Sequence, residues 1–515
     1  MPQTPCDDTV AKTAPIVFGS VSAGDVAPTL QFPGPNSGTV ASPHLHEILI
    51  GLGGDRRALD VCRRVTIFSA VTLLVGCGGD NSGGGSASNP SPASLAVSQL
   101  SPFAPTFLLP EIPVHLSSAV VTSHQLVVKD GQAHAVWLEI DPATRASRGV
   151  FYRRLGLSSY ASTPVTSLSS TSGAIPSFRL AVSSVSPHVF VAWEQAGQIV
   201  VAGSKDNGDT WRSVAASAGM SGIHHAPEIV AFTLAAVLTW EVRRPSGAVE
   251  VLWAPLRFSG PMLSLGSIPQ SLDRTGAAYA PLIAGTGDSA FVVAYLSGTD
   301  KIYGRRTSDG GLSWSPAQRL NPSGSAPVDS LRIASTETGR CAAVWVENSG
   351  GHERILGTTM DSFSAGWAPT PVLLSTNPGP FSVASDPQLC LAGEGFRVAW
   401  QDNRDGSFAI FSSYYSPSQG WSPDRPVGSG AGSAIQPSIA AHGDNVLIAW
   451  VGVTPASGIF YATSSDSGNH FTMEQRADDA SSPSPLHPAV AMGVRDEVVM
   501  LFVVSTGLVH DWAHR

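Results

Sequence analysis

Acidic and other polar side chains recur at two regular places along this 515-residue sequence. One place directly follows short apolar runs that end in an aromatic residue, and it holds Glu139, Glu194, Glu241, Glu347 and Asp402. The other lies 14–16 residues upstream of such aromatics, and it holds His225, Tyr279, Asp386, Gln436 and His487. Carboxylates, imidazoles and phenols can transfer protons or attack electrophiles, and they also hydrogen-bond polar ligands. The two sets therefore predict either acid–base chemistry or recognition of a polar ligand.

The aromatic residues mark an internal repeat that must position these groups. Eight of them lie 47–56 residues apart: Trp137, Trp193, Trp240, Tyr295, Trp345, Trp400, Trp450 and Phe502. Each sits in a short apolar run, with further runs upstream and downstream. Four short strands per unit, repeated around an axis, are typical of a β-propeller. The sequence predicts an all-β propeller of four-stranded antiparallel blades over residues 106–515, with eight blades expected and seven as the alternative.

The two ends of this region predict how the ring closes. The last repeat stops after its third strand, whereas Pro113–Ser118 resembles the fourth strands of other repeats. An N-terminal strand that completes the C-terminal blade would remove an exposed sheet edge. We therefore expect the first strand of the domain to pair with the last.

Three nearly identical turns occur between the third and fourth predicted strands: SKDNGDTW at 204–211, TSDGGLSW at 307–314 and SSDSGNHF at 464–471. Their aspartates are expected to accept backbone hydrogen bonds, their glycines to take positive φ, and their aromatic residues to pack between sheets. The residues with these structural roles are Asp206, Gly208, Trp211, Asp309, Gly311, Trp314, Asp466, Gly468 and Phe471.

The turn pattern S/T-x-D-x-G-x-x-W/F resembles the Asp-box, or BNR repeat, of the sialidase superfamily. This resemblance implies an active site on the propeller face opposite the Asp-boxes. A sialidase-like exo-glycosidase acting on sialylated glycans would use Tyr279 as nucleophile, Glu241 as its base and Asp386 as acid/base. Arg243 and Arg404 would bind the substrate carboxylate. The Phe/Tyr-Arg-Ile-Pro motif of sialidases is missing from the sequence.

That missing motif favours a second interpretation, a non-catalytic propeller that binds a glycan or protein ligand at its mouth. The candidate ligand-binding residues are His225, Gln436, His487, Asp402, Arg404 and Arg243. The acids near the aromatics would alternatively pair with neighbouring arginines, and the tryptophans would pack between blades. No metal site or cofactor is predicted, and a monomer is expected.

Composition limits the partners. The net charge is −9 and charged residues make up 13%, so no basic field predicts nucleic-acid binding. Cys341 and Cys390 either form a disulfide or are two buried thiols.

Residues 61–80, VCRRVTIFSAVTLLVGCGGD, resemble a bacterial lipoprotein signal. This resemblance implies a signal peptide at 61–76, lipidation of Cys77, and a Gly/Ser/Pro-rich tether over 77–105. The protein would be exported to the outer membrane or cell surface and would contact the membrane only through its lipid. Residues 1–60 would be disordered, or would precede the true start of translation.

Overall fold

The computed structural model describes residues 103, 105, 112–116, 119–157, 162–169, 174–233, 235–285, 289–322, 326–376, 382–428, 432–454, 457–479, 485–504 and 507–513. The chain divides into two compact units, Met1–Asp60 and Val61–Arg515, and every described residue belongs to the second. The predicted signal peptide, Cys77 and residues 1–60 lie outside the described residues. Within those residues, no helix is long and apolar enough to cross a membrane.

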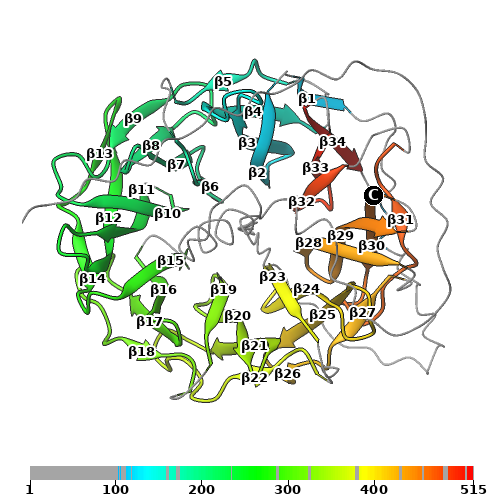
Figure 1. Ribbon diagram of the computed structural model, residues 1–515. Helices are drawn as coiled ribbons and strands as arrows, with labels where there is room; N and C mark the ends of the chain where they lie inside the picture. Colours follow the sequence, from blue (N-terminus) through cyan, green and yellow to red (C-terminus); the bar gives the residue numbers. More distant parts are fainter. Residues whose placement is uncertain are drawn as a thin grey trace, which may run out of the picture. The chain divides into compact units, whose positions relative to one another are not determined.

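The described strands form eight antiparallel sheets arranged around an axis (Figure 1). Blade 1 contains β2 (Val120–Lys129), β3 (Gln132–Ile140), β4 (Ser147–Gly156) and β5 (Thr166–Ser167). Blade 2 contains β6 (Phe178–Val182), β7 (Val189–Gln195), β8 (Gln198–Ser204) and β9 (Arg212–Ala215). Blade 3 contains β10 (Ile223–Ala231), β11 (Ala235–Arg243), β12 (Val249–Ser259), β13 (Met262–Leu265) and β14 (Gln270–Asp273). Blade 4 contains β15 (Ala278–Gly285), β16 (Phe291–Ser297), β17 (Lys301–Thr307) and β18 (Gln318–Arg319).

The second half of the ring repeats this order. Blade 5 contains β19 (Val328–Ser335), β20 (Cys341–Ser349), β21 (His352–Met360) and β22 (Val372–Leu373). Blade 6 contains β23 (Ala384–Ala392), β24 (Gly395–Asp402), β25 (Ala409–Ser416), β26 (Gly420–Trp421) and β27 (Arg425–Val427). Blade 7 contains β28 (Ser433–His442), β29 (Asn445–Thr454), β30 (Gly458–Ser464) and β31 (Gln475–Arg476). Blade 8 contains β32 (Leu486–Met492), β33 (Val498–Val504), β34 (Gly507–Ala513) and β1 (Ile112–Leu116).

The predicted all-β, eight-bladed propeller is confirmed, and the seven-bladed alternative is excluded. The predicted closure is also confirmed, because β1 pairs antiparallel with β34, as in Ile112↔His510 and Leu116↔Gly507. Figure 1 shows this junction as the blue first strand beside the red last strand. The first and last parts of the propeller thus share one sheet.

Apolar packing lies between blades. Eight buried clusters each combine side chains from two neighbouring blades, including blades 8 and 1. All eight aromatic marks of the repeat are buried, so they pack between blades and are not a surface for stacking ligands. Each such side chain contributes about 1.5–3 kcal/mol when removed from water. Cys341 and Cys390 are both free and buried, and burial raises the pKa of the Cys390 thiol to about 12.

The Asp-box turns are held by local hydrogen bonds. In the second of them, Asp309 Oδ1 accepts the backbone N–H of Ser313 at 2.9 Å, and the Gly311 N–H donates to Thr307 Oγ1 at 3.0 Å. The Ser313 hydrogen bonds lower the pKa of Asp309 to about 2. The turn also contacts the preceding blade, because the Trp314 and Trp253 rings lie 5.3 Å apart. Asp206 and Asp466 accept the equivalent backbone bonds at 2.8 and 2.9 Å.

Adjacent glycines in this turn allow a matched test. Gly310 and Gly311 have φ of 71° and 87°, but only a Cβ on Gly311 would meet another residue, 2.0 Å from the Trp253 ring. We expect Gly310→Ala to cost about 1–2 kcal/mol of unfolding free energy, from φ strain alone. Gly311→Ala adds overpacking of about 1–3 kcal/mol. Equal urea midpoints for the two variants would contradict this account of the turn.

Candidate functional site

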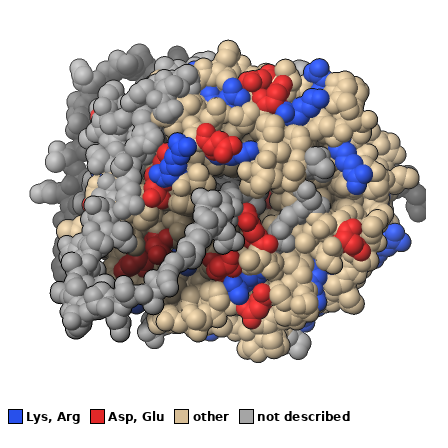
Figure 2. Space-filling model, turned by 180° about the vertical axis from the view of Figure 1, so that it is seen from behind, with Lys and Arg blue, Asp and Glu red and all other residues tan. Residues whose placement is uncertain are grey.

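The direction of the strands defines two faces of the ring. Because consecutive strands are antiparallel, inner strands begin on the face where second strands end, and we call this the site face. The Asp-box turns follow the third strands and lie on the other face. Figure 2 shows one face of the molecule, on which cationic and acidic side chains lie close to each other among uncharged residues. The predicted ligand-binding residues all come from strand ends on the site face.

One backbone feature repeats on the site face in blades 3 to 8. Each inner strand there has a register shift near its start, so that one extra residue bulges from the ladder. The bulge residue has positive φ between 47° and 56° in every case: Ala226, Ala280, Ser330, Asp386, Gln436 and His487. In five of the six bulges the next residue is proline. Left-handed backbone costs about 1–2 kcal/mol for a residue other than glycine, so surrounding contacts must hold it.

Those contacts come from the preceding blade. Glu241 Oε2 at the end of β11 accepts the Ala280 N–H at 3.0 Å. Gln401 Oε1 in β24 accepts the Gln436 N–H at 2.8 Å. Gln436 Oε1 in turn accepts the His487 N–H at 3.1 Å. These side chains therefore connect neighbouring blades while they fix the bulges.

The bulge side chains differ around the ring. Blades 3, 4 and 5 carry alanine, alanine and serine, whereas blades 6, 7 and 8 carry Asp386, Gln436 and His487. All three polar residues are half-buried. Burial raises the pKa of Asp386, although Arg332 opposes this shift, and burial lowers the pKa of His487. Three adjacent blades thus present hydrogen-bonding groups from equivalent positions, which we call the polar arc.

A second polar group joins blades 2 and 3. His225 Nδ1 lies 2.8 Å from Glu194 Oε1, and the imidazole remains 32% exposed. The hydrogen bond with Glu194 raises the pKa of His225, and the charge of Glu241 acts in the same direction. Arg243, at the end of β11, is exposed and acts in the opposite direction. An imidazole held at one nitrogen leaves its other nitrogen to contact a ligand.

Arg404, Asp402 and Glu139 take part in ion pairs. Arg404 lies 2.5 Å from Asp402 and 2.6 Å from Asp424. Glu139 accepts the indole N–H of Trp137 at 2.8 Å and lies 3.0 Å from His115 in β1. Burial raises the pKa of Glu347, and this shift is opposed by the nearby Arg354.

The groups of the sialidase hypothesis spread over several blades. Tyr279 and Glu241 are neighbours, because the carboxylate binds the backbone beside the tyrosine. Asp386 lies in blade 6, two blades from Tyr279, and the two candidate arginines lie in blades 3 and 6. In the described part of the chain, no group of three or more His, Cys, Asp or Glu residues could hold a metal ion.

Sequence reasoning missed an ion pair between inner strands. Arg179 Nε in β6 lies 2.6 Å from Glu228 Oε1 in β10, and both side chains are buried. Burial raises the pKa of Glu228, and Arg179 opposes that rise. The equivalent positions in blades 4 and 8 are apolar, Leu282 and Ala489. A charged residue at this position of the repeat is the signal that could have revealed the ion pair.

Comparisons with known proteins assign the chain to no family. No protein-family model and no curated protein matches the chain. Similar solved structures include a PL25 ulvan lyase, at 10% identity over 63% of this chain and 89% of that chain, with a TM-score of 0.41. The Hadza microbial sialidase Hz136 has 13% identity over 64% and 73% of the chains, with a TM-score of 0.34. YCF48 bound to a D1 peptide has 14% identity over 67% and 92%, with a TM-score of 0.39.

Proposed function

We propose that this protein is a non-catalytic binding propeller whose glycan or protein ligand contacts the polar arc on the site face. The observation that carries the proposal is the left-handed bulge repeated in six blades, which carries a carboxyl, an amide and an imidazole side chain in three adjacent blades. Residues held in left-handed backbone cluster at functional sites. A carboxyl, an amide and an imidazole together donate and accept hydrogen bonds, as sugar hydroxyls and peptide groups require.

The contacts of the predicted catalytic groups support binding over sialidase-like hydrolysis. Glu241, the predicted base, already accepts a backbone N–H, and its carboxylate is buried. Arg404, which was predicted to bind the substrate carboxylate, already pairs with the carboxylates of two aspartates. A glycosidase would need Glu241 and Arg404 to contact the substrate. In this structure Glu241 binds the backbone of the next blade, and Arg404 forms ion pairs with Asp402 and Asp424.

We further propose that the protein is a lipoprotein of the bacterial outer membrane or cell surface, anchored through Cys77. Thr463, near the Asp-box end of β30, donates its hydroxyl to the Phe103 carbonyl at 3.0 Å. The chain therefore joins the propeller at the face opposite the polar arc. An anchor on that side would leave the site face directed towards ligands outside the cell.

The test uses one substitution at three equivalent bulges. The purified protein would be screened against immobilised glycans and peptides, and the ligand found would be titrated against Asp386→Asn, His487→Asn and Ser330→Asn. Asparagine tolerates left-handed backbone, so each variant keeps the bulge. We expect the first two variants to bind about 2- to 10-fold more weakly, since one hydrogen bond contributes about 0.5–1.5 kcal/mol. Ser330→Asn, in blade 5, is expected to retain affinity.

Equal affinities for all three variants would place the ligand elsewhere. A fluorogenic sialoside would be assayed in parallel, with Tyr279→Phe as the control. Turnover of the sialoside that disappears in Tyr279→Phe would show that the protein is a glycosidase and would contradict the proposed non-catalytic function.

A further inference from the structure

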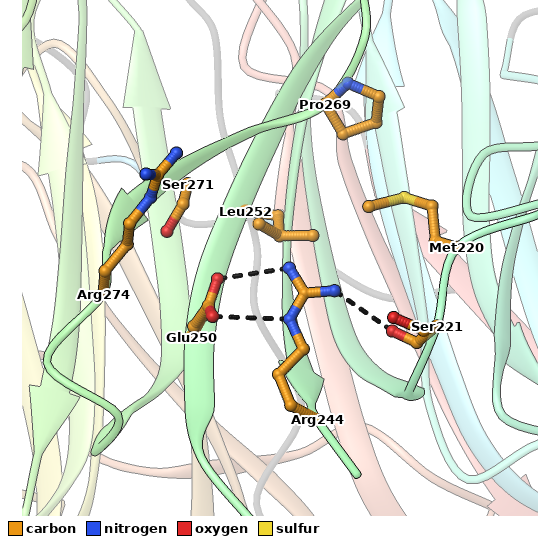
Figure 3. Close-up of a pocket in the computed structure, with 8 residues that line it drawn as sticks. All are labelled: Met220, Ser221, Arg244, Glu250, Leu252, Pro269, Ser271 and Arg274. Carbon is orange, nitrogen blue, oxygen red and sulfur yellow. Dashed lines mark hydrogen bonds and ion pairs between the residues drawn. The ribbon is translucent and has the colours of Figure 1, made fainter. Parts of the chain in front are cut away.

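A pocket of 390 Å³ lies at the outer part of blade 3 (Figure 3). It is lined by Met220, Ser221, Arg244, Glu250, Leu252, Pro269, Ser271 and Arg274. Blade 3 differs from most blades because two short strands, β13 and β14, pair with successive parts of β12. The pocket lies beside β14, on the outer side of the sheet, and it includes neither a bulge residue nor any residue of the polar arc.

The pocket is lined by two positive side chains and one negative side chain. Arg244 Nη2 lies 3.2 Å from Glu250 Oε2, its Nε lies 3.4 Å from Glu250 Oε1, and its Nη1 donates to the Ser221 carbonyl at 3.1 Å. Arg274 is exposed and forms no ion pair with any residue that the structure describes. Figure 3 shows the two guanidinium groups on either side of Glu250. Two arginines and one glutamate leave the pocket with a positive charge, in a chain of net charge −9.

From this arrangement we infer that the pocket binds a small organic carboxylate, through Arg274 with Arg244 beside it. A guanidinium group matches the two oxygens of a carboxylate in a planar, bidentate contact. Ser221 and Ser271 add polar groups at the wall, whereas Met220 and Pro269 offer apolar surface to the carbon skeleton. A sugar acid and the C-terminus of a peptide share this chemistry. The pocket is separate from the proposed ligand site of the polar arc.

Calorimetric titration of the purified protein tests the inference with three probes: glucuronate, N-acetyl-leucine and uncharged glucose. We expect saturable binding of at least one carboxylate and none of glucose, and the stronger carboxylate identifies a sugar or a peptide source. Arg274→Gln is expected to weaken that binding at least 10-fold. Glu250→Gln is expected to strengthen it several-fold, because it removes the negative charge beside Arg244.

Arg257→Gln is the matched control, since Arg257 is an exposed arginine of β12 in the same blade but does not line the pocket. It should bind the carboxylate as the unmodified protein does, and so should Asp386→Asn. Two results would overturn the inference: no saturable binding of either carboxylate, or equal loss of affinity in Arg274→Gln and Arg257→Gln. Because the two charge changes have opposite expected signs, a variant that merely unfolds cannot produce the predicted pair of results.

Discussion

Replacing Arg404 by methionine is expected to lower the free energy of unfolding by about 3–5 kcal/mol at neutral pH. The guanidinium group pairs with Asp402 at 2.5 Å and with Asp424 at 2.6 Å, and these carboxylates are only 1% and 5% exposed. Methionine keeps much of the side-chain volume but leaves two buried negative charges without their cation. The loss comes from that uncompensated charge, because an isolated buried carboxylate is far less stable than a hydrated one.

The guanidinium group of Arg404 also contacts Phe411 and the segment that links blades 5 and 6. Its Cζ lies 4.0 Å from the centre of the Phe411 ring, and its Nη1 donates to the Thr376 carbonyl at 2.5 Å. Thr376 also donates its hydroxyl and its N–H to Asp424. Arg404 therefore holds the segment between blades 5 and 6 against the site face of blade 6.

Neutralising the two carboxylates separates the charge effect from lost packing. If the deficit of Arg404→Met comes from uncompensated charge, adding Asp402→Asn and Asp424→Asn should recover a large part of it. Urea unfolding at neutral pH measures this change.

Arg243→Met is the matched control, because Arg243 is exposed on the same face and was also predicted to bind a carboxylate. It is expected to change stability by no more than about 0.5 kcal/mol. A deficit for Arg404→Met that equals that of Arg243→Met, or that the two asparagine substitutions do not reduce, would show that the ion pairs contribute nothing measurable.

The fold was predictable because its signal is repeated. Eight aromatic marks, three Asp-box turns and an incomplete last repeat all point to one ring, and each blade supplies an independent copy of the pattern. The closure by β1 was predictable for the same reason. The segment at Pro113 resembles the fourth strands of other repeats, and the last repeat lacks a fourth strand of its own. Errors at single positions cannot change such a conclusion.

The directions of the polar side chains were not predictable in the same way. The sequence places Glu241 after an aromatic mark, but its partner is the backbone N–H of Ala280 in the next blade, 39 residues later. Asp424 lies on the fourth-strand side of blade 6 and is not marked by the repeat, yet it completes the Arg404 site. Such hydrogen-bond partners depend on how the blades pack. When the partner is a backbone N–H, the residue type at that position does not reveal it in the sequence.

The beginning of the packed region shows the same limit. Composition predicts a tether up to residue 105, because Ser and Pro are frequent there. Phe103 is nevertheless 1% exposed and packs in the apolar cluster between blades 7 and 8. Other members of that cluster, such as Tyr461 and Val490, lie more than 350 positions later. Only the closed ring brings these positions together.

Phe103→Ala is therefore expected to destabilise the propeller by about 3–5 kcal/mol, the usual cost of removing a fully buried phenylalanine ring. The reason is a cavity between blades 7 and 8, beside the junction where β1 closes the ring. The backbone nearby is also fixed, since the Tyr461 hydroxyl donates to the Pro105 carbonyl at 3.1 Å. Urea unfolding followed by tryptophan fluorescence measures the change, with Met473→Ala as a control.

Met473 lies in the Asp-box region of blade 7 and is 81% exposed, so its removal should change stability by no more than about 0.5 kcal/mol. If Phe103→Ala unfolds at the same urea concentration as this control, the chain before β1 adds nothing to closure, and strand pairing alone holds the ring. If it unfolds earlier, the N-terminal segment holds two blades at once: β1 completes blade 8, and Phe103 packs blade 7 against it. A chain beginning at residue 107 should then show the same deficit as Phe103→Ala or a larger one, because it also lacks the Pro105 carbonyl.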